Sequence, residues 1–227
     1  MLNIPTSSLR PSGRLLPPNQ RVAQREGDLG LPEGTQVYSA DSHLTLTEDI
    51  WYDRFPASLK DRAPRVWRQD GVSHFGFGGQ SIMPKILIDC IKHFETMPGC
   101  HSGNIEARIA EIGAEGIYGE LVFPAILILF HHPDYELREL CFRIYNEYLA
   151  ELQSRAPGRF YGVGLINWWD PKATRASLEH LKELGLKTFL LPLNAGKSPD
   201  GEPIDFSSSA MTPFWEEVEA ADLPVCH

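Results

Sequence analysis

Residues 160–192 read FYGVGLINWWDPKATRASLEHLKELGLKTFLLP: a short apolar segment, a helical segment and a second apolar segment. Asp170 followed by Pro171 predicts the start of the helix, because aspartate is a good N-cap and proline suits the first helical position. Gly185 predicts its end, because glycine readily adopts the conformation that follows a helix. The stretch therefore predicts a strand–helix–strand unit whose two strands pair in parallel. The expected bounds are 160–167, 171–184 and 187–192.

The same alternation extends in both directions along the chain. Mostly continuous apolar strands are expected when helices cover both faces of a parallel sheet. No G-x-G-x-x-G motif follows any predicted strand, so a dinucleotide-binding fold has no support. Between a doubly wound open sheet and a barrel, the sequence favours a TIM (β/α)8-type barrel, with only about the first five βα units present. The other expected strands are 36–43, 118–124 and 223–227, and the other expected helices are 104–114, 134–155 and 212–221.

Two segments fall outside this alternation. Residues 1–35 contain several prolines and glycines without hydrophobic periodicity, which predicts an irregular N-terminal arm. Residues 44–103 form a long insertion after the first strand, and excursions of this length commonly serve as a lid or an active-site wall. The expected organisation is an arm over 1–35 and a partial barrel over 36–227.

The composition limits the classes of partner. The formal net charge of -9 argues against binding to nucleic acid, because no surplus of lysine and arginine is present to neutralise phosphates. The same charge disfavours an anionic membrane surface. No signal peptide or membrane-spanning segment is recognisable, and the four cysteines show no zinc-finger spacing, so they read as reduced thiols. The expected location is the cytoplasm.

The strongest chemical signal is the pair Asp41 and His43 at the end of the first predicted strand. Side chains two residues apart on a strand point to the same face, so a carboxylate and an imidazole converge there. His227 ends the last predicted strand in the same way, and the three side chains together are candidate ligands of one divalent metal. The alternative is that Asp41 caps the following loop and that His43 is an ordinary rim histidine.

Several other residues near strand ends are weaker candidates. Glu120, inside a predicted strand, is either a hydrogen-bond acceptor behind the metal ligands or a structural ion pair between layers. His131 is a candidate substrate contact or part of an exposed loop, and Trp168 is a candidate pocket wall or a packing residue. Asn194 is either a substrate-facing amide or a turn residue, and Phe123 joins the candidate substrate contacts.

A resemblance to a known family rests on a set of short motifs spread over residues 37–227. The motifs are Ala40-Asp41-Ser42-His43, Asp49-Ile50-Trp51, DRAPRV at 61–66, GIYGELVFP at 116–124, YNEYL at 145–149, APGRF at 156–160 and LPVCH at 223–227. They resemble the amidohydrolase-related family, the branch of the amidohydrolase superfamily that includes aminocarboxymuconate-semialdehyde decarboxylase.

The resemblance implies a (β/α)8 barrel with one divalent metal, commonly zinc, with manganese or iron as alternatives. It assigns Asp41 and His43 as the ligands from the first strand and His227 as the ligand from the fifth. It also implies a catalytic aspartate on an eighth strand, which would lie beyond residue 227.

Three functions remain open from the sequence. The first expectation is a metal-dependent hydrolase of a small organic substrate, in which the metal activates a water molecule. The alternative is non-oxidative, metal-dependent decarboxylation of an aromatic or dienoic acid. A hypothesis of another class is a non-catalytic half-barrel that needs a partner. The expected partners are a small-molecule substrate and either further copies of the chain or a complementing C-terminal chain.

Overall fold

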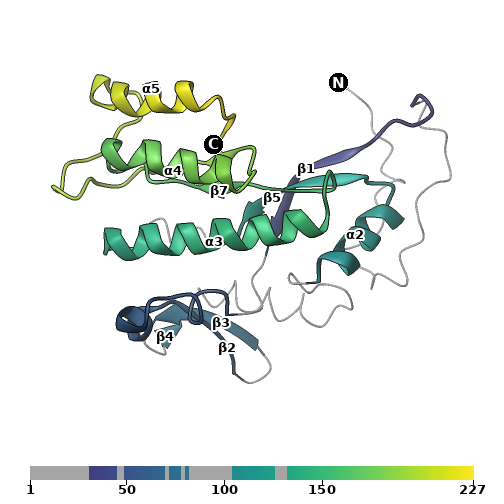
Figure 1. The fold of residues 1–227 in the computed structure, drawn as a ribbon, viewed down its shortest axis with the longest axis horizontal. Coiled ribbons are helices and arrows are strands. Elements are labelled where there is room, and N and C mark those ends of the chain that lie inside the picture. Colours follow the sequence, from purple (N-terminus) through teal and green to yellow (C-terminus); the bar gives the residue numbers. More distant parts are fainter. Residues whose placement is uncertain (1–30, 45–48, 70–71, 78–79, 82–103, 126–131) are drawn as a thin grey trace, which may run out of the picture.

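The computed structural model describes residues 31–44, 49–69, 72–77, 80–81, 104–125 and 132–227 (Figure 1). Most of the predicted arm and the second half of the predicted insertion therefore lie outside the described residues. No helix in the described part is long and apolar enough to cross a membrane.

Six strand segments run in parallel in the order of the sequence. β1 (Tyr38–Leu44) pairs with β5 (Gly119–Pro124), and β5 pairs with β6 (Phe160–Gly162). β7 (Gly164–Leu165) pairs with β8 (Phe189–Leu190), and β8 pairs with β9 (Val225–Cys226). This order confirms the predicted parallel βα architecture.

Val163 joins the two halves of this sheet. Its amide donates to the carbonyl oxygen of Val122 in β5 at 2.9 Å, and the next amide, of Gly164, donates to the carbonyl oxygen of Thr188 at 3.0 Å. β6 and β7 are therefore the two ends of the single strand predicted over 160–167. Within the described residues the strands form an open arc and do not close into a barrel.

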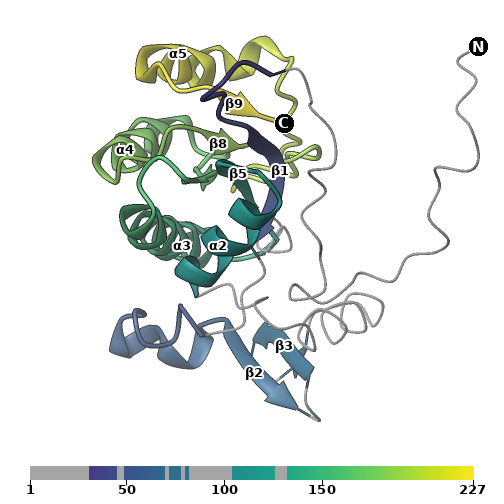
Figure 2. The same ribbon diagram turned by 90° about the vertical axis from the view of Figure 1, so that its right-hand side faces the viewer.

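Four helices cover one side of this arc, as Figure 2 shows. Three of them begin at the capping side chains Asn104, Asp134 and Asp170, each of which accepts a hydrogen bond from an amide of the first turn. Local sequence therefore determines where these helices start. Their bounds are α2 (Ile105–Ala114), α3 (Tyr135–Arg155), α4 (Pro171–Glu183) and α5 (Thr212–Ala221).

The described part of the insertion packs on α3, on the side away from α4 (Figure 1). It contains a 3-10 helix η3 (Ala57–Arg62) and an antiparallel sheet of β2 (Arg65–Gln69), β3 (Val72–Phe77) and β4 (Gln80–Ser81). Trp51 is fully buried, and two ion pairs, Arg54–Glu151 and Arg62–Asp134, hold the same unit to α3.

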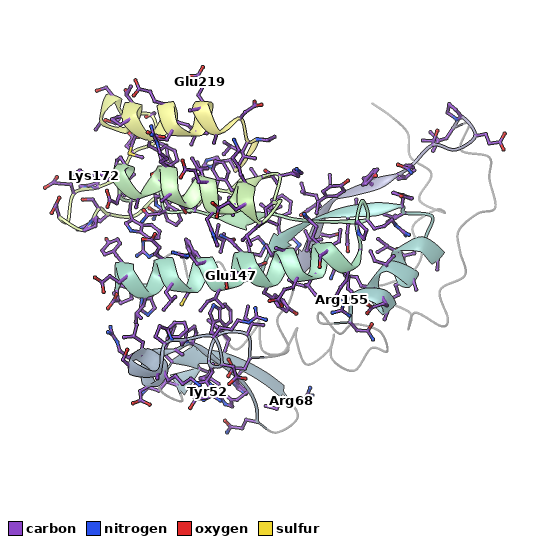
Figure 3. All side chains as sticks on the ribbon, in the orientation of Figure 1. Tyr52, Arg68, Glu147, Arg155, Lys172 and Glu219 are labelled. Carbon is purple, nitrogen blue, oxygen red and sulfur yellow. The ribbon has the colours of Figure 1, made fainter. Side chains whose placement is uncertain are left out.

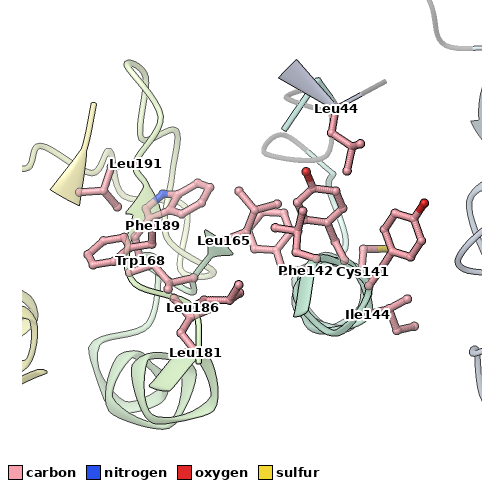
Figure 4. Packing of buried hydrophobic residues seen from close by; sticks show 14 of the residues in the cluster. Leu44, Cys141, Phe142, Ile144, Leu165, Trp168, Leu181, Leu186, Phe189 and Leu191 are labelled. Carbon is pink, nitrogen blue, oxygen red and sulfur yellow. The ribbon is translucent and has the colours of Figure 1, made fainter. Parts of the chain in front are cut away.

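The hydrophobic core lies between the strands and α3 and α4. Figure 4 shows Trp168 and Phe189 beside Leu165 and Leu191, with Phe142 of α3 across from them. Charged residues such as Arg155 and Lys172 lie at the exposed surface of the helices (Figure 3). Because α3 contacts the sheet on one side and the insertion on the other, it carries buried residues along its whole length.

Candidate metal centre

A β-bulge shapes the end of β1. Ser39 pairs with Glu120 and Ser42 pairs with Val122, so β1 has one residue more than β5 over this interval. The hydroxyl groups of Ser39 and Ser42 lie 3.1 Å apart, which places these two serines on the same face. Bulges of this kind redirect side chains and are common beside functional sites.

Asp41 and His43 lie side by side on the face opposite the serines. Their atoms Oδ1 and Nδ1 are 3.9 Å apart, which confirms that the two side chains point the same way. The side chains are 83% and 58% exposed respectively, so neither is covered by packing. A carboxylate and an imidazole are thus open to a ligand from the same direction.

The donor chemistry of this pair suits a shared divalent ion. Metal–ligand bonds of about 2.1 Å place neighbouring donor atoms of a tetrahedral or octahedral ion about 3.0–3.4 Å apart. The 3.9 Å separation of Asp41 and His43 is wider than this, so their exposed side chains would turn toward one another to share an ion. An oxygen and a nitrogen donor suit manganese, iron or zinc, and the pair can therefore supply two of the ligands of a metal site.

His227 is not part of this pair. It is exposed and follows β9, and its ring packs edge-on against Phe206, with centroids 6.4 Å apart. β1 and β9 are the two outer strands of the arc, and no group of three histidine, cysteine, aspartate or glutamate side chains in the described residues is close enough to hold a metal. The ligand role of His227 stays a prediction.

Phe123 lies next to the pair. It is the register partner of His43 in β5, and the two rings are 6.2 Å apart at their centroids. An aromatic side chain therefore borders the Asp41–His43 pair, and Phe123 remains a candidate substrate contact.

Glu120 points to the opposite face of β5. It is 1% exposed and forms an ion pair with Arg108 of α2 through the Nε of Arg108, and Nη2 of Arg108 donates to Oε2 of Glu120 at 3.0 Å. The same Nη2 donates to the backbone carbonyl oxygen of His43 at 3.1 Å. Glu120 thus forms an ion pair between β5 and α2. It is connected to the Asp41–His43 pair through Arg108 and the backbone carbonyl group of His43.

Arg108 was not identified from the sequence. The one available signal was the buried carboxylate itself, because a charged group inside a strand needs a cationic partner. The spacing of Arg108 and Glu120 does not identify that partner, since the two residues lie in different elements and meet only through helix packing.

Two of the predicted substrate contacts have structural roles. Trp168 is fully buried, and its indole Nε1 donates to the carbonyl oxygen of Ala195 at 2.9 Å, which favours the packing alternative. Asn194 is exposed, and its Oδ1 accepts a hydrogen bond from the amide of Gly196, which favours the turn alternative. His131 lies outside the described residues.

A second polar cluster lies at the start of α3. Arg138 is 6% exposed and its guanidinium is close to the rings of Tyr135 and Trp169, at 4.5 and 4.6 Å from their centroids. It donates to the carbonyl oxygen of His132, and burial lowers the pKa of the His132 imidazole. These contacts hold His132 against the first turn of α3.

Comparison with known proteins identifies several relatives. Residues 133–226 match a family model described as "Amidohydrolase". A gamma-resorcylate decarboxylase from Polaromonas sp. (strain JS666 / ATCC BAA-500) is 36% identical over 83 residues, which are 35% of this chain and 24% of that protein.

Solved structures share the fold. An amidohydrolase from Mycobacterium avium subsp. paratuberculosis superposes with a TM-score of 0.62 at 18% identity, over 85% of this chain and 58% of that one. A second structure is that of a dihydroxybenzoic acid decarboxylase from Polaromonas sp. JS666, with bound manganese and the inhibitor 2-nitroresorcinol. It superposes with a TM-score of 0.52 at 20% identity, over 84% of this chain and 48% of that one. The chain thus spans about half the length of the solved structures that it matches.

Proposed function

We propose that the chain forms the metal-binding part of a non-oxidative decarboxylase of aromatic carboxylic acids, since residues 133–226 match the amidohydrolase family model. The observation that carries the proposal is the open Asp41–His43 pair beside Phe123. The sequence analysis expected hydrolysis first and decarboxylation as the alternative. The similarity to the gamma-resorcylate decarboxylase over 83 residues supports decarboxylation.

Asp41 and His43 would hold the ion, one through a carboxylate oxygen and the other through an imidazole nitrogen. A bound divalent ion supplies a Lewis acid that orients the oxygen atoms of the substrate and neutralises their charge. Manganese is the first ion to test, because the similar dihydroxybenzoic acid decarboxylase contains it. Zinc and iron are the alternatives. Phe123 would pack against the ring of the substrate and orient it on the pair.

Hydrolysis is the second candidate function. It is supported by the similarity to the amidohydrolase from Mycobacterium avium subsp. paratuberculosis, which superposes over 85% of this chain. The two reactions differ in what replaces the leaving group. Decarboxylation puts a proton on the carbon that carried the carboxylate, whereas hydrolysis puts an oxygen of water on the carbon that is attacked.

Isotope labelling separates the two functions. The full-length protein with manganese is given 2,6-dihydroxybenzoate in D2O. The expected product is resorcinol that carries one deuterium at C2, the former carboxylate position. A parallel reaction of amide and ester substrates in H2 18O tests hydrolysis through 18O in the product acid. Labelled acid in the second reaction together with no deuterium in the first would overturn decarboxylation.

Matched variants connect the activity to the site. Asp41→Asn is expected to lose manganese binding and decarboxylation together, because the amide oxygen is a weaker ligand than a carboxylate. Asp200→Asn makes the same change at an exposed residue of the 193–208 loop and is expected to change neither. Equal activity in the two variants would contradict the assignment of Asp41.

A further inference from the structure

We propose that Arg108 and Glu120 are positioning residues that fix the end of β1, so that the donor atoms of Asp41 and His43 face one ion. The inference rests on the proposed function. Neither residue touches the ion or the substrate, since Glu120 lies on the opposite face of β5 from Phe123 and Arg108 contacts His43 only at its backbone.

The end of β1 depends on backbone contacts for its position. Asp41 and His43 are largely exposed, so packing does not hold their side chains. Among the described residues β1 pairs with one strand only, and its register with that strand shifts at the bulge just before Ser42. A small rotation of the backbone at His43 would therefore separate the two donor atoms.

Arg108 supplies the missing restraint from outside the sheet. Its Nη2 donates both to Oε2 of Glu120 and to the carbonyl oxygen of His43, at 3.0 and 3.1 Å. Glu120 is anchored in β5 and almost fully buried, and the side chain of Arg108 is 19% exposed. The guanidinium thus joins the end of β1 to a buried carboxylate of β5.

The arrangement requires arginine. A planar guanidinium engages both oxygens of a carboxylate and keeps further N–H groups for a carbonyl oxygen, whereas an ammonium group is a point charge on a flexible chain. Lysine at position 108 would keep the charge next to Glu120 but would not hold the same geometry at His43. Arg108→Lys therefore tests whether the geometry of the guanidinium at His43 matters, because the variant keeps a positive charge beside Glu120.

The test measures manganese affinity instead of activity. Each variant of the full chain is titrated with MnCl2, free Mn2+ is counted by electron paramagnetic resonance, and urea unfolding is recorded in parallel. Arg108→Lys is expected to bind Mn2+ about 10- to 100-fold more weakly than the wild type, the usual effect of losing a group that orients a ligand. The double variant R108M/E120M removes both charges and so leaves no unpaired buried charge. It is expected to show the same loss of Mn2+ affinity.

A second ion pair on the same helix provides the matched control. Glu106 of α2 pairs with Arg155 of α3 and, in the described part of the chain, has no hydrogen bond to β1, so E106M/R155M is expected to bind Mn2+ like the wild type. Wild-type affinity in Arg108→Lys, or in a folded R108M/E120M protein, would overturn the inference and leave the proposed function intact. A wild type that binds Mn2+ no better than Asp41→Asn would overturn both.

Discussion

The indole Nε1 of Trp51 donates a hydrogen bond to the backbone carbonyl oxygen of Cys141 at 3.1 Å, and both residues are fully buried. This bond joins the insertion to the N-terminal half of α3, ninety residues further along the chain. The ring of Trp51 also packs on Phe75 of β3, with centroids 5.3 Å apart. Trp51 therefore links the insertion to the body of the molecule.

Trp51→Phe is expected to lower the free energy of unfolding by about 1–3 kcal/mol, because it removes a buried donor and part of a buried ring. Urea denaturation measures the change. Trp215→Phe is the control, since Trp215 also donates to a backbone carbonyl but is 36% exposed, and the expected change is below about 1 kcal/mol. Equal losses in the two variants would show that burial of Trp51 contributes nothing.

Two glycines are expected to respond to alanine with opposite signs. A Cβ at Gly119 would lie 2.8 Å from the carbonyl oxygen of Arg159 and 2.7 Å from the ring of Tyr38, so Gly119→Ala forces the backbone just before β6 to shift. We expect it to destabilise the fold by about 1–3 kcal/mol. Thermal unfolding of the purified variant measures this loss.

Gly113→Ala is the matched variant. Gly113 lies in the last turn of α2, and among the described residues a Cβ there would meet only the guanidinium of Arg159, at an ordinary 3.6 Å. Alanine favours a helix over glycine by about 0.5–1 kcal/mol, so the melting temperature is expected to rise. A fall in both variants would mean that the packing around α2 differs from that described.

Asn146 completes the backbone hydrogen bonds of β7. Its side-chain Nδ2 donates to the carbonyl oxygen of Leu165 at 2.7 Å, and its Oδ1 accepts from the amide of the same residue at 2.8 Å. Asn146→Ala leaves two buried polar groups without partners and is expected to cost about 2–5 kcal/mol. Asn194→Ala removes one exposed turn contact and is expected to cost less than about 1 kcal/mol, and chemical denaturation of both variants tests the difference.

The free energy of unfolding is expected to decrease as the pH is lowered, because His132 takes up a proton. Burial lowers the pKa of its imidazole, and Arg138 and Arg62 lower it further, while the backbone and the carboxylate of Asp134 act against them. A lowered pKa means that the unfolded chain binds the proton more tightly than the folded chain. The stability that neutral His132 contributes is thus complete above the ordinary pKa of 6.5 and is lost as the pH falls through the lowered folded pKa.

His132→Asn removes the titrating group at this position. The variant is expected to lose less stability than the wild type between about pH 7 and pH 5, the range in which histidine ordinarily titrates. Urea midpoints at both pH values give the comparison. An identical decrease in wild type and variant would place the pH dependence on other groups.

Much of the secondary structure could be predicted from the sequence, because its signals are local. The caps Asp134 and Asp170 and the terminator Gly185 fix α3 and α4 to within a residue or two of the expected bounds. The strands were predicted at the right places but too long. β8 covers only Phe189–Leu190 of the expected 187–192, because a strand's length depends on which neighbours pair with it.

The sequence by itself determined the βα alternation and the strand-end position of Asp41 and His43, because helix caps, apolar runs and the two-residue period act over a few residues. Only the tertiary structure decided the contacts that surround this pair. The bulge at Ser42, the outward direction of Glu120 and its pairing with Arg108 depend on strand register and helix packing. These bring together residues far apart in the chain, and no local pattern specifies which of them meet.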